Sequence, residues 1–316
     1  MQAFVENFLQ ALVAGVLNGS IYGLMCVGLG LIFGVMRVIN FAQGEFLMLG
    51  MYATLYIVTS LGVAAVFGPY LGPFIGAVLA GLLLFAGGYL LHRYLVSRVT
   101  GVRAIGAEGE GHYAQLILTL GVSLVLQNGG LILFGSTPQS VRTPLSASAW
   151  EVGVPLGEAA VFINKARTVA ALFAVAATAA LFWFINRSRL GKALRAAADN
   201  PEAALYMGID VDRAHRIAFG IGTGVTAMAG GLVATYYPFQ PYVGLEFVII
   251  MYAGVVLGGM GSILGAFWGG MTIGLVQQLS SLAMSVQLQN VAIFVVFLLI
   301  VLLRPQGLYG RSVDRT

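Results

Sequence analysis

Residues 9–35 of the chain read LQALVAGVLNGSIYGLMCVGLGLIFGV and contain no Asp, Glu, Lys or Arg. A helix of about 20 apolar residues crosses the roughly 30 Å hydrocarbon core of a bilayer, so this stretch is long enough to span a membrane. It also exceeds the apolar region of a secretory signal peptide, and we expect it to be retained. The stretch therefore predicts a transmembrane helix.

The rest of the chain has the same character. Of its 316 residues, 59% are hydrophobic and only 9% are charged, with a mean hydropathy of +0.91, which excludes an ordinary soluble domain. The 43 glycines favour helices packed backbone to backbone. We predict an all-α, polytopic transmembrane bundle of about nine spans, within a range of roughly eight to ten, as a single transmembrane domain over residues 1–316. The candidate spans are 9–35, 41–60, 71–92, 114–134, 168–186, 217–237, 246–262, 264–284 and 289–303.

The basic residues predict the orientation. If residues 187–216 face the cytoplasm, thirteen of the sixteen Lys and Arg residues lie inside, and only Arg142, Lys165 and Arg167 lie outside. The N-terminus is then external and the C-terminus cytoplasmic. Because these residues cluster at the ends of apolar runs, the net charge of +4 indicates a membrane surface and no nucleic-acid partner.

Two apolar segments resemble each other. Residues 44–53 read GEFLMLGMYA and residues 245–254 read LEFVIIMYAG, so both contain Glu-Phe and then Met-Tyr-Ala. In the predicted topology they run in opposite directions, as the halves of an inverted repeat do, and paired segments of this kind mark a transport path. Chance similarity between two apolar segments is the alternative.

The most polar stretch, residues 187–216, contains signals for a short helix. Asp199 or Asn200 suits the N-cap, Pro201 and Glu202 suit the first turn, and Gly208 suits the end. A helix of about seven residues is unstable alone in water, so it requires a surface on which to dock.

Several motifs resemble one family. Glu202-Ala203-Ala204, followed after three residues by Gly208, looks like the EAA loop of ABC importer permeases, although the Leu-Pro that ends the longer pattern is missing. Residues 18–24 (NGSIYGL), 31–46 (LIFGVMRVINFAQGEF) and 304–310 (RPQGLYG) are similar to the LivH-type permeases of branched-chain amino acid uptake. This similarity covers essentially the whole chain.

The resemblance implies a permease subunit of an ATP-driven importer in the bacterial inner membrane, with residues 1–316 as a single permease domain and residues 187–216 as its cytoplasmic, EAA-like coupling loop. Its expected partners are a second related permease, two ABC ATPase subunits and a periplasmic solute-binding protein. The expected cargo is branched-chain amino acids, with urea, short amides or other small organic acids as alternatives. The segment expected to couple to the ATPase comprises Asp199, Asn200, Pro201, Glu202, Ala203, Ala204 and Gly208.

We expect no catalytic site, metal site or cofactor in this chain. It has no Gly-x-x-x-x-Gly-Lys-Ser/Thr phosphate loop, so ATP and Mg²⁺ belong on the ATPase subunits. An intramembrane enzyme is disfavoured because His92, His112 and His215 lack an accompanying Cys or carboxylate cluster. An ion-coupled carrier has only Glu45 and Glu246 as intramembrane candidates.

Uncharged polar residues in or near the spans, together with the two glutamates, are the candidates for the translocation path, because a transported solute needs weak, reversible contacts. The alternative role for each is a hydrogen bond between packed helices. The external stretch 135–165 is a candidate dock for the binding protein, or a membrane-surface loop anchored by Trp150. The path candidates are Asn18, Ser20, Asn40, Gln43, Glu45, Gln127, Asn128, Gln240, Glu246, Gln277 and Gln278.

Overall fold

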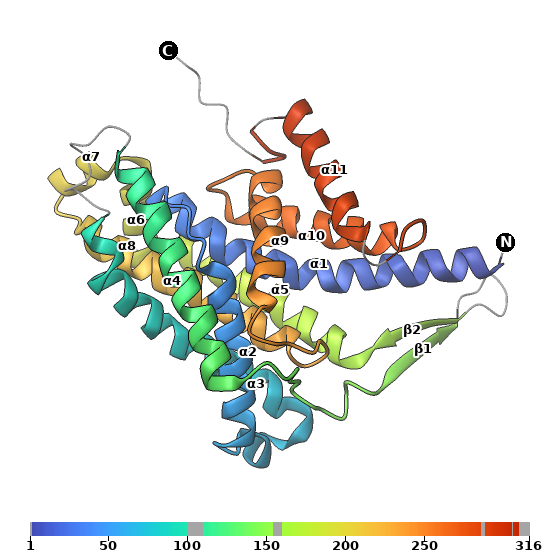
Figure 1. Cartoon of the computed structure of the whole chain (residues 1–316). Helices are drawn as coiled ribbons and strands as arrows, with labels where there is room; N and C mark the ends of the chain where they lie inside the picture. The colour runs from blue at the N-terminus through green and yellow to red at the C-terminus, as the bar shows by residue number, and fades with distance from the viewer. Residues whose placement is uncertain (1, 100–109, 154–159, 286–287, 305, 310–316) are drawn as a thin grey trace.

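A computed structural model describes residues 2–99, 110–153, 160–285, 288–304 and 306–309. The described part is predominantly helical, as expected (Figure 1). Its elements are α1 (Gln2–Met36), α2 (Gln43–Thr59), α3 (Val63–Tyr94), η1 (Val96–Arg98), α4 (Glu110–Phe134), β1 (Ala149–Gly153), β2 (Ala160–Asn164), α5 (Lys165–Arg187), α6 (Arg189–Asp199), α7 (Pro201–Tyr206), α8 (Val211–Val233), α9 (Val243–Gly258), α10 (Ile263–Ser280) and α11 (Gln289–Leu303).

Each of the nine candidate spans coincides with one of these helices, but the helices differ in length. In the described ranges, five are long and apolar enough to cross a membrane: α1, α3, α4, α5 and α8. The paired Glu-Phe segments form two shorter helices, α2 with 17 residues and α9 with 16, each roughly 25 Å long. Gly68 interrupts α3 with a non-helical φ of 80°, between the candidate spans 41–60 and 71–92.

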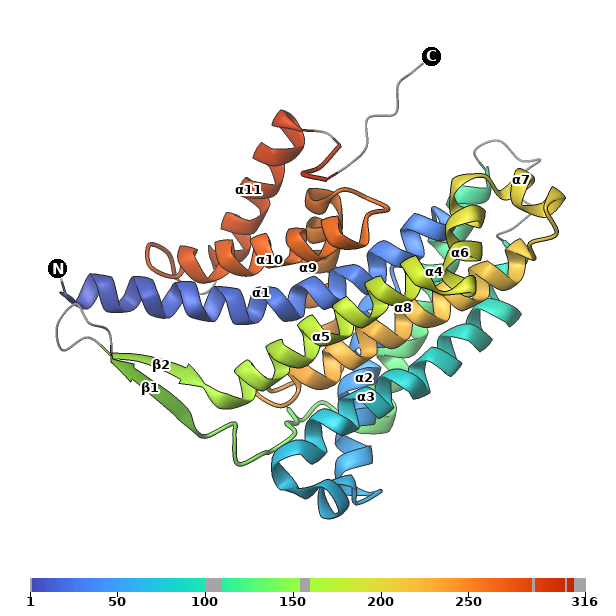
Figure 2. The ribbon, with the colours of Figure 1, turned by 180° about the vertical axis from the view of Figure 1, so that it is seen from behind.

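The helices pack in a reciprocal pattern. α1 lies along α10 and α3 lies along α8, while α1 and α8 contact each other (Figures 1 and 2). α2 packs on α3, and α9 packs on α10. Exchanging α1, α2 and α3 with α8, α9 and α10 therefore preserves the main contacts, which is the arrangement that an inverted repeat predicts.

Glycine permits the closest of these contacts. A Cβ added at Gly19 of α1 would lie 2.9 Å from Met271 Sδ of α10, and one at Gly270 would lie 2.5 Å from Gly23 N. The two repeat segments meet in the same way, because a Cβ at Gly244 would lie 2.8 Å from Gly44 O. Small residues thus bring the first turns of α2 and α9 together, as small residues do between helices in lipid.

An antiparallel hairpin of β1 and β2 in the stretch 135–165 was not expected. Its short, partly alternating strands gave too weak a pattern. The side chain of Gln10 on α1 pairs with the backbone of β2: Gln10 Nε2 donates to Phe162 O at 2.7 Å, and Phe162 N donates to Gln10 Oε1 at 2.9 Å. Trp150 is 46% exposed, with Lys165 Nζ 5.7 Å from its ring centre. The hairpin is therefore fixed to α1 and not a free loop.

Replacing Gln10 with alanine should release this hairpin. The change removes both hydrogen bonds and costs roughly 1–3 kcal/mol of local stability. We expect faster limited proteolysis around residues 149–164 in the purified protein, with the Tm of the bundle nearly unchanged. Asn128→Ala, which removes only a bond within α4 from Asn128 Nδ2 to Leu124 O, is the control and should leave hairpin cleavage unaltered.

Candidate functional site

The expected coupling loop, residues 187–216, contains two short helices, α6 and α7, where a single one was predicted. α6 was not anticipated, because its many basic residues suggested a loop. It is amphipathic: Gly191, Leu194 and Ala197, spaced by three, are buried while its basic residues face outward. α6 packs against α1, α5 and α8, and so supplies the docking surface that the segment requires.

α7 begins and ends as the sequence predicts, although it has six residues rather than about seven. Asp199 is the exposed last residue of α6, and Asn200 both follows α6 and caps α7, with Asn200 Oδ1 accepting from Ala203 N at 2.9 Å. Pro201 opens the helix, and Gly208 has the left-handed φ of 79° just beyond its end.

One face of α7 is buried and the other is open. Ala204 is 3% exposed and anchors the helix, while Glu202 and Ala203 are exposed. Tyr206 and Met207 are 90% and 81% exposed, and neither was among the residues expected to contact the ATPase. The sequence did contain a signal for this contact surface, because two large apolar residues stand side by side inside a polar stretch. Exposed aromatic and Met side chains of this kind are typical of protein contacts.

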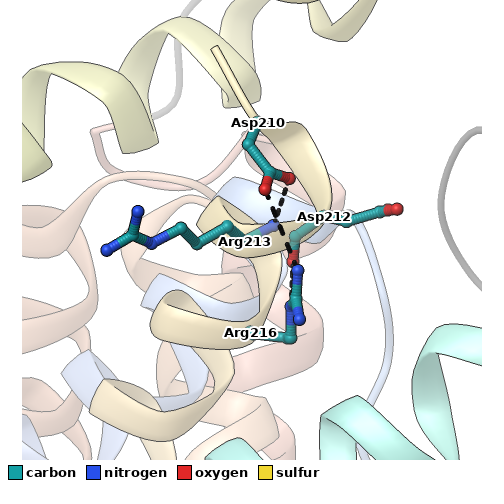
Figure 3. A network of polar contacts seen from close by, with 4 residues as sticks. All are labelled: Asp210, Asp212, Arg213 and Arg216. Carbon is teal, nitrogen blue, oxygen red and sulfur yellow. Dashed lines mark hydrogen bonds and ion pairs between the residues drawn. The ribbon is translucent and has the colours of Figure 1, made fainter.

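Polar contacts fix the start of α8, directly after the turn that follows α7 (Figure 3). Asp210 caps α8 by accepting from Arg213 N at 2.8 Å, and its other oxygen lies 3.9 Å from a terminal nitrogen of Arg216. Arg216 Nε donates to Asp212 O at 3.1 Å. Local polar contacts therefore stabilise the start of α8, where the chain returns from α7.

The coupling segment lies at one end of the molecule. Both ribbon views place α6 and α7 at one end, and the hairpin and the N-terminus at the other (Figures 1 and 2). α5 connects the two ends, running 23 residues from β2 to the start of α6, a distance of roughly 34 Å. The two surfaces expected to contact soluble partners thus lie at opposite ends of an apolar helix.

Three of the path candidates lie where the repeat segments meet. Asn40 and Gln43 are fully buried, with Asn40 Nδ2 donating to Gln43 Oε1 at 2.9 Å and Gln43 Nε2 donating to Gly222 O at 3.1 Å. Glu45 is 1% exposed and accepts from Ser123 Oγ of α4 at 3.3 Å. In the chain as described, these groups connect α2 to α8 and α4.

A second group lies around α1, α9 and α10. Gln277 accepts a hydrogen bond from Tyr22 at 2.9 Å, and Asn18, one turn before Tyr22, is buried with its Oδ1 unpartnered. Glu246 is exposed and accepts from the Tyr237 hydroxyl at 3.3 Å. Tyr22 and Tyr237 both pack edge-on against Phe247, at 6.0 and 5.9 Å between ring centres.

The remaining path candidates do not join either group through a side-chain contact. Ser20 and Asn128 donate to backbone carbonyls one turn earlier in their own helices. Gln127 is buried with its Nε2 unpartnered, Gln240 is exposed in the α8–α9 connection, and Gln278 is half-buried on α10. Their place in a path stays a prediction.

The histidines show no metal-binding arrangement. In the part of the chain that the structure describes, no three His, Cys, Asp or Glu side chains are grouped to hold a metal ion. His92 and His215 are buried, and the His92 ring lies 5.6 Å from the Phe219 ring. The side chain of His112 lies outside the described residues.

Known proteins match this chain along nearly its whole length. The family model described as branched-chain amino acid transport system / permease component matches residues 11–303. The LivH permease protein of high-affinity branched-chain amino acid transport from Escherichia coli is 32% identical over 305 residues, 96% of each chain. BraD of Pseudomonas aeruginosa, also a permease protein of high-affinity branched-chain amino acid transport, is 28% identical over 97% of each chain.

A more distant relative has a different cargo in its name. The autoinducer 2 import permease LsrC of an Enterobacter species is 29% identical over 75% of this chain and 73% of its own. No solved structure matches the chain. The family match over nearly the full length, together with the multi-pass apolar helices, shows that the chain belongs to the permease components of branched-chain amino acid transport systems.

Proposed function

We propose that this chain is a permease subunit of an ATP-driven importer of branched-chain amino acids in the bacterial inner membrane. In this proposal it pairs with a second related permease, two ABC ATPase subunits and a periplasmic solute-binding protein. The observation that carries the proposal is α7, a capped six-residue helix with an anchored face and an exposed Tyr206.

α7 has the properties of a mechanical lever. Its Ala204 face contacts α6 and α8, and α6 is packed on α1, α5 and α8. A force applied to the exposed face therefore reaches three of the long helices through packed contacts. Rigid-body movement of this kind is how closing domains shift membrane helices. The proposal places α7 and the C-terminus in the cytoplasm, in keeping with the distribution of Lys and Arg.

The opposite end suits the binding protein. The hairpin is held by Gln10, and its β1 strand is exposed along its whole length. We infer that this fixed and exposed surface receives the loaded binding protein, and that the polar residues around the α2–α9 contact line the path between the two ends. The amino acid is released when the ATPases move α7.

Reconstitution tests the function. The chain, co-expressed with a second permease, two ATPases and a binding protein encoded beside it, should import radiolabelled leucine into proteoliposomes only when ATP is inside. Uptake should be independent of sodium, and neither urea nor a short-chain organic acid should be imported. The purified chain alone should hydrolyse no ATP. Sodium-driven uptake without ATP would instead establish a secondary carrier, and urea import would establish the alternative cargo.

A further inference from the structure

A groove lies between α9 and α11, beside the start of α9. It has a volume of about 200 Å³, and its lining is mostly aliphatic and aromatic. The lining residues are Leu245, Glu246, Ile249, Ile250, Asn290, Ile293 and Phe294.

Glu246 is the one charged residue in the sequences of α9 and α11. The outward faces of these helices are apolar, with Ile249 47% and Leu298 56% exposed. A carboxylate facing hydrocarbon costs several kcal/mol, so such a residue normally faces a partner, a solute or water. Among the described residues, no Lys, Arg or His nitrogen lies within 4.0 Å of the Glu246 carboxylate.

The equivalent glutamate of the first repeat has a different environment. Glu45 is 1% exposed and accepts from Ser123 Oγ, and a Cβ at Gly244 would lie 3.0 Å from Glu45 Oε1, so α4 and α9 cover this carboxylate. Glu246 is exposed, and the hydroxyl of Tyr237 orients its Oε2. The repeat thus contains one covered and one open carboxylate, and the open one lines this groove.

We propose that this groove binds the ammonium group and the branched aliphatic side chain of the transported amino acid. The inference rests on the proposed function and names the chemistry that this part of the path recognises. Glu246 supplies the counter-charge for the ammonium group, and Ile249, Ile293 and Phe294 supply the apolar wall. Asn290 offers an amide donor for the carboxylate.

The charge of Glu246 discriminates between classes of cargo. Urea and short amides carry no positive charge and gain nothing from the carboxylate, while an organic acid is repelled by it. An α-amino acid satisfies both the carboxylate and the apolar wall. Charge complementarity therefore favours an amino acid over the other solutes considered.

Direct binding tests the groove. The purified complex of permeases and ATPases, without the binding protein, should bind radiolabelled leucine weakly. Isoleucine should compete, but isocaproate, which is leucine without its ammonium group, should not. Glu246→Gln should weaken leucine binding by roughly tenfold to a hundredfold, the usual worth of a charge-assisted contact. Glu6→Gln, which removes a carboxylate from the first turns of α1, is the matched control and should bind normally.

A second variant fills the groove without changing its charge. Ile249→Trp should abolish leucine binding while the second permease and the ATPases still co-purify. The proposal is overturned if wild type shows no leucine binding, if Glu246→Gln binds leucine normally or if isocaproate competes equally. It is also overturned if either variant loses the second permease, because the groove is then a subunit contact. Failure of the wild-type complex to import leucine would refute the proposed function itself, a separate result.

Discussion

Replacing Tyr206 and Met207 with alanine should abolish most ATP-driven uptake while leaving the protein folded in the membrane. These side chains are 90% and 81% exposed, so the fold loses almost no packing when they are removed. Exposed aromatic residues at the centre of an interface contribute about 2 kcal/mol or more each, and loss of one such contact weakens binding by roughly thirtyfold. We expect the ATPases to co-purify poorly and leucine uptake in proteoliposomes to fall at least about tenfold.

Two further variants test whether the effect depends on the surface of α7 or on the loss of any exposed tyrosine. Tyr70→Ala removes another exposed tyrosine, near the start of α3, and should leave ATPase binding and uptake intact. Glu202→Arg reverses the charge on the exposed first turn of α7 and should also uncouple transport. Wild-type uptake by the Tyr206 and Met207 double variant would remove α7 from the coupling mechanism.

Replacing Gly50 with leucine should prevent correct folding. A Cβ at Gly50 of α2 would overlap the backbone of Ala227 on α8, and neither backbone has room to give. The two helices must separate, which costs about 3 kcal/mol or more because overpacking displaces backbone as well as side chains. We expect little monodisperse protein in detergent, and a strongly lowered Tm for any that is recovered.

Gly121→Leu is the matched control for this change. Gly121 is also within a membrane helix, α4, but a Cβ there would meet no atom within 4 Å. The same substitution should therefore leave yield and Tm close to wild type. Equal loss of protein from both variants would show that glycine-mediated contact between α2 and α8 is not what holds the bundle together.

Local signals in the sequence predicted the helices well. The apolar run 9–35 lies inside α1, and the Asn200-Pro201 start of α7 depends only on neighbouring residues. α6 and the hairpin were missed because both are stabilised by distant contacts. α6 depends on the surfaces of α1, α5 and α8, and β2 depends on Gln10, 152 residues away.

The path residues show the same division. The sequence marked Glu45 and Glu246 as equivalents, and it could not distinguish them, because Ser123 of α4 and Gly244 of α9 cover only Glu45. The exposure of Tyr206 likewise depends on which face of α7 docks. Residue type identified the candidates, and the packing of distant helices decided their surroundings.

Asn200 joins α6 to α7 without an intervening linker, and its φ of −148° and ψ of 99° alone set the angle between the two helices. If the ATPases move α7 as proposed, no flexible linker lies between α7 and α6 to absorb that movement. The backbone angles of this one residue therefore decide the direction in which a movement of α7 would displace α6. A substitution that changes the backbone angles of Asn200 is expected to change the direction of that displacement, without altering the exposed surface of α7.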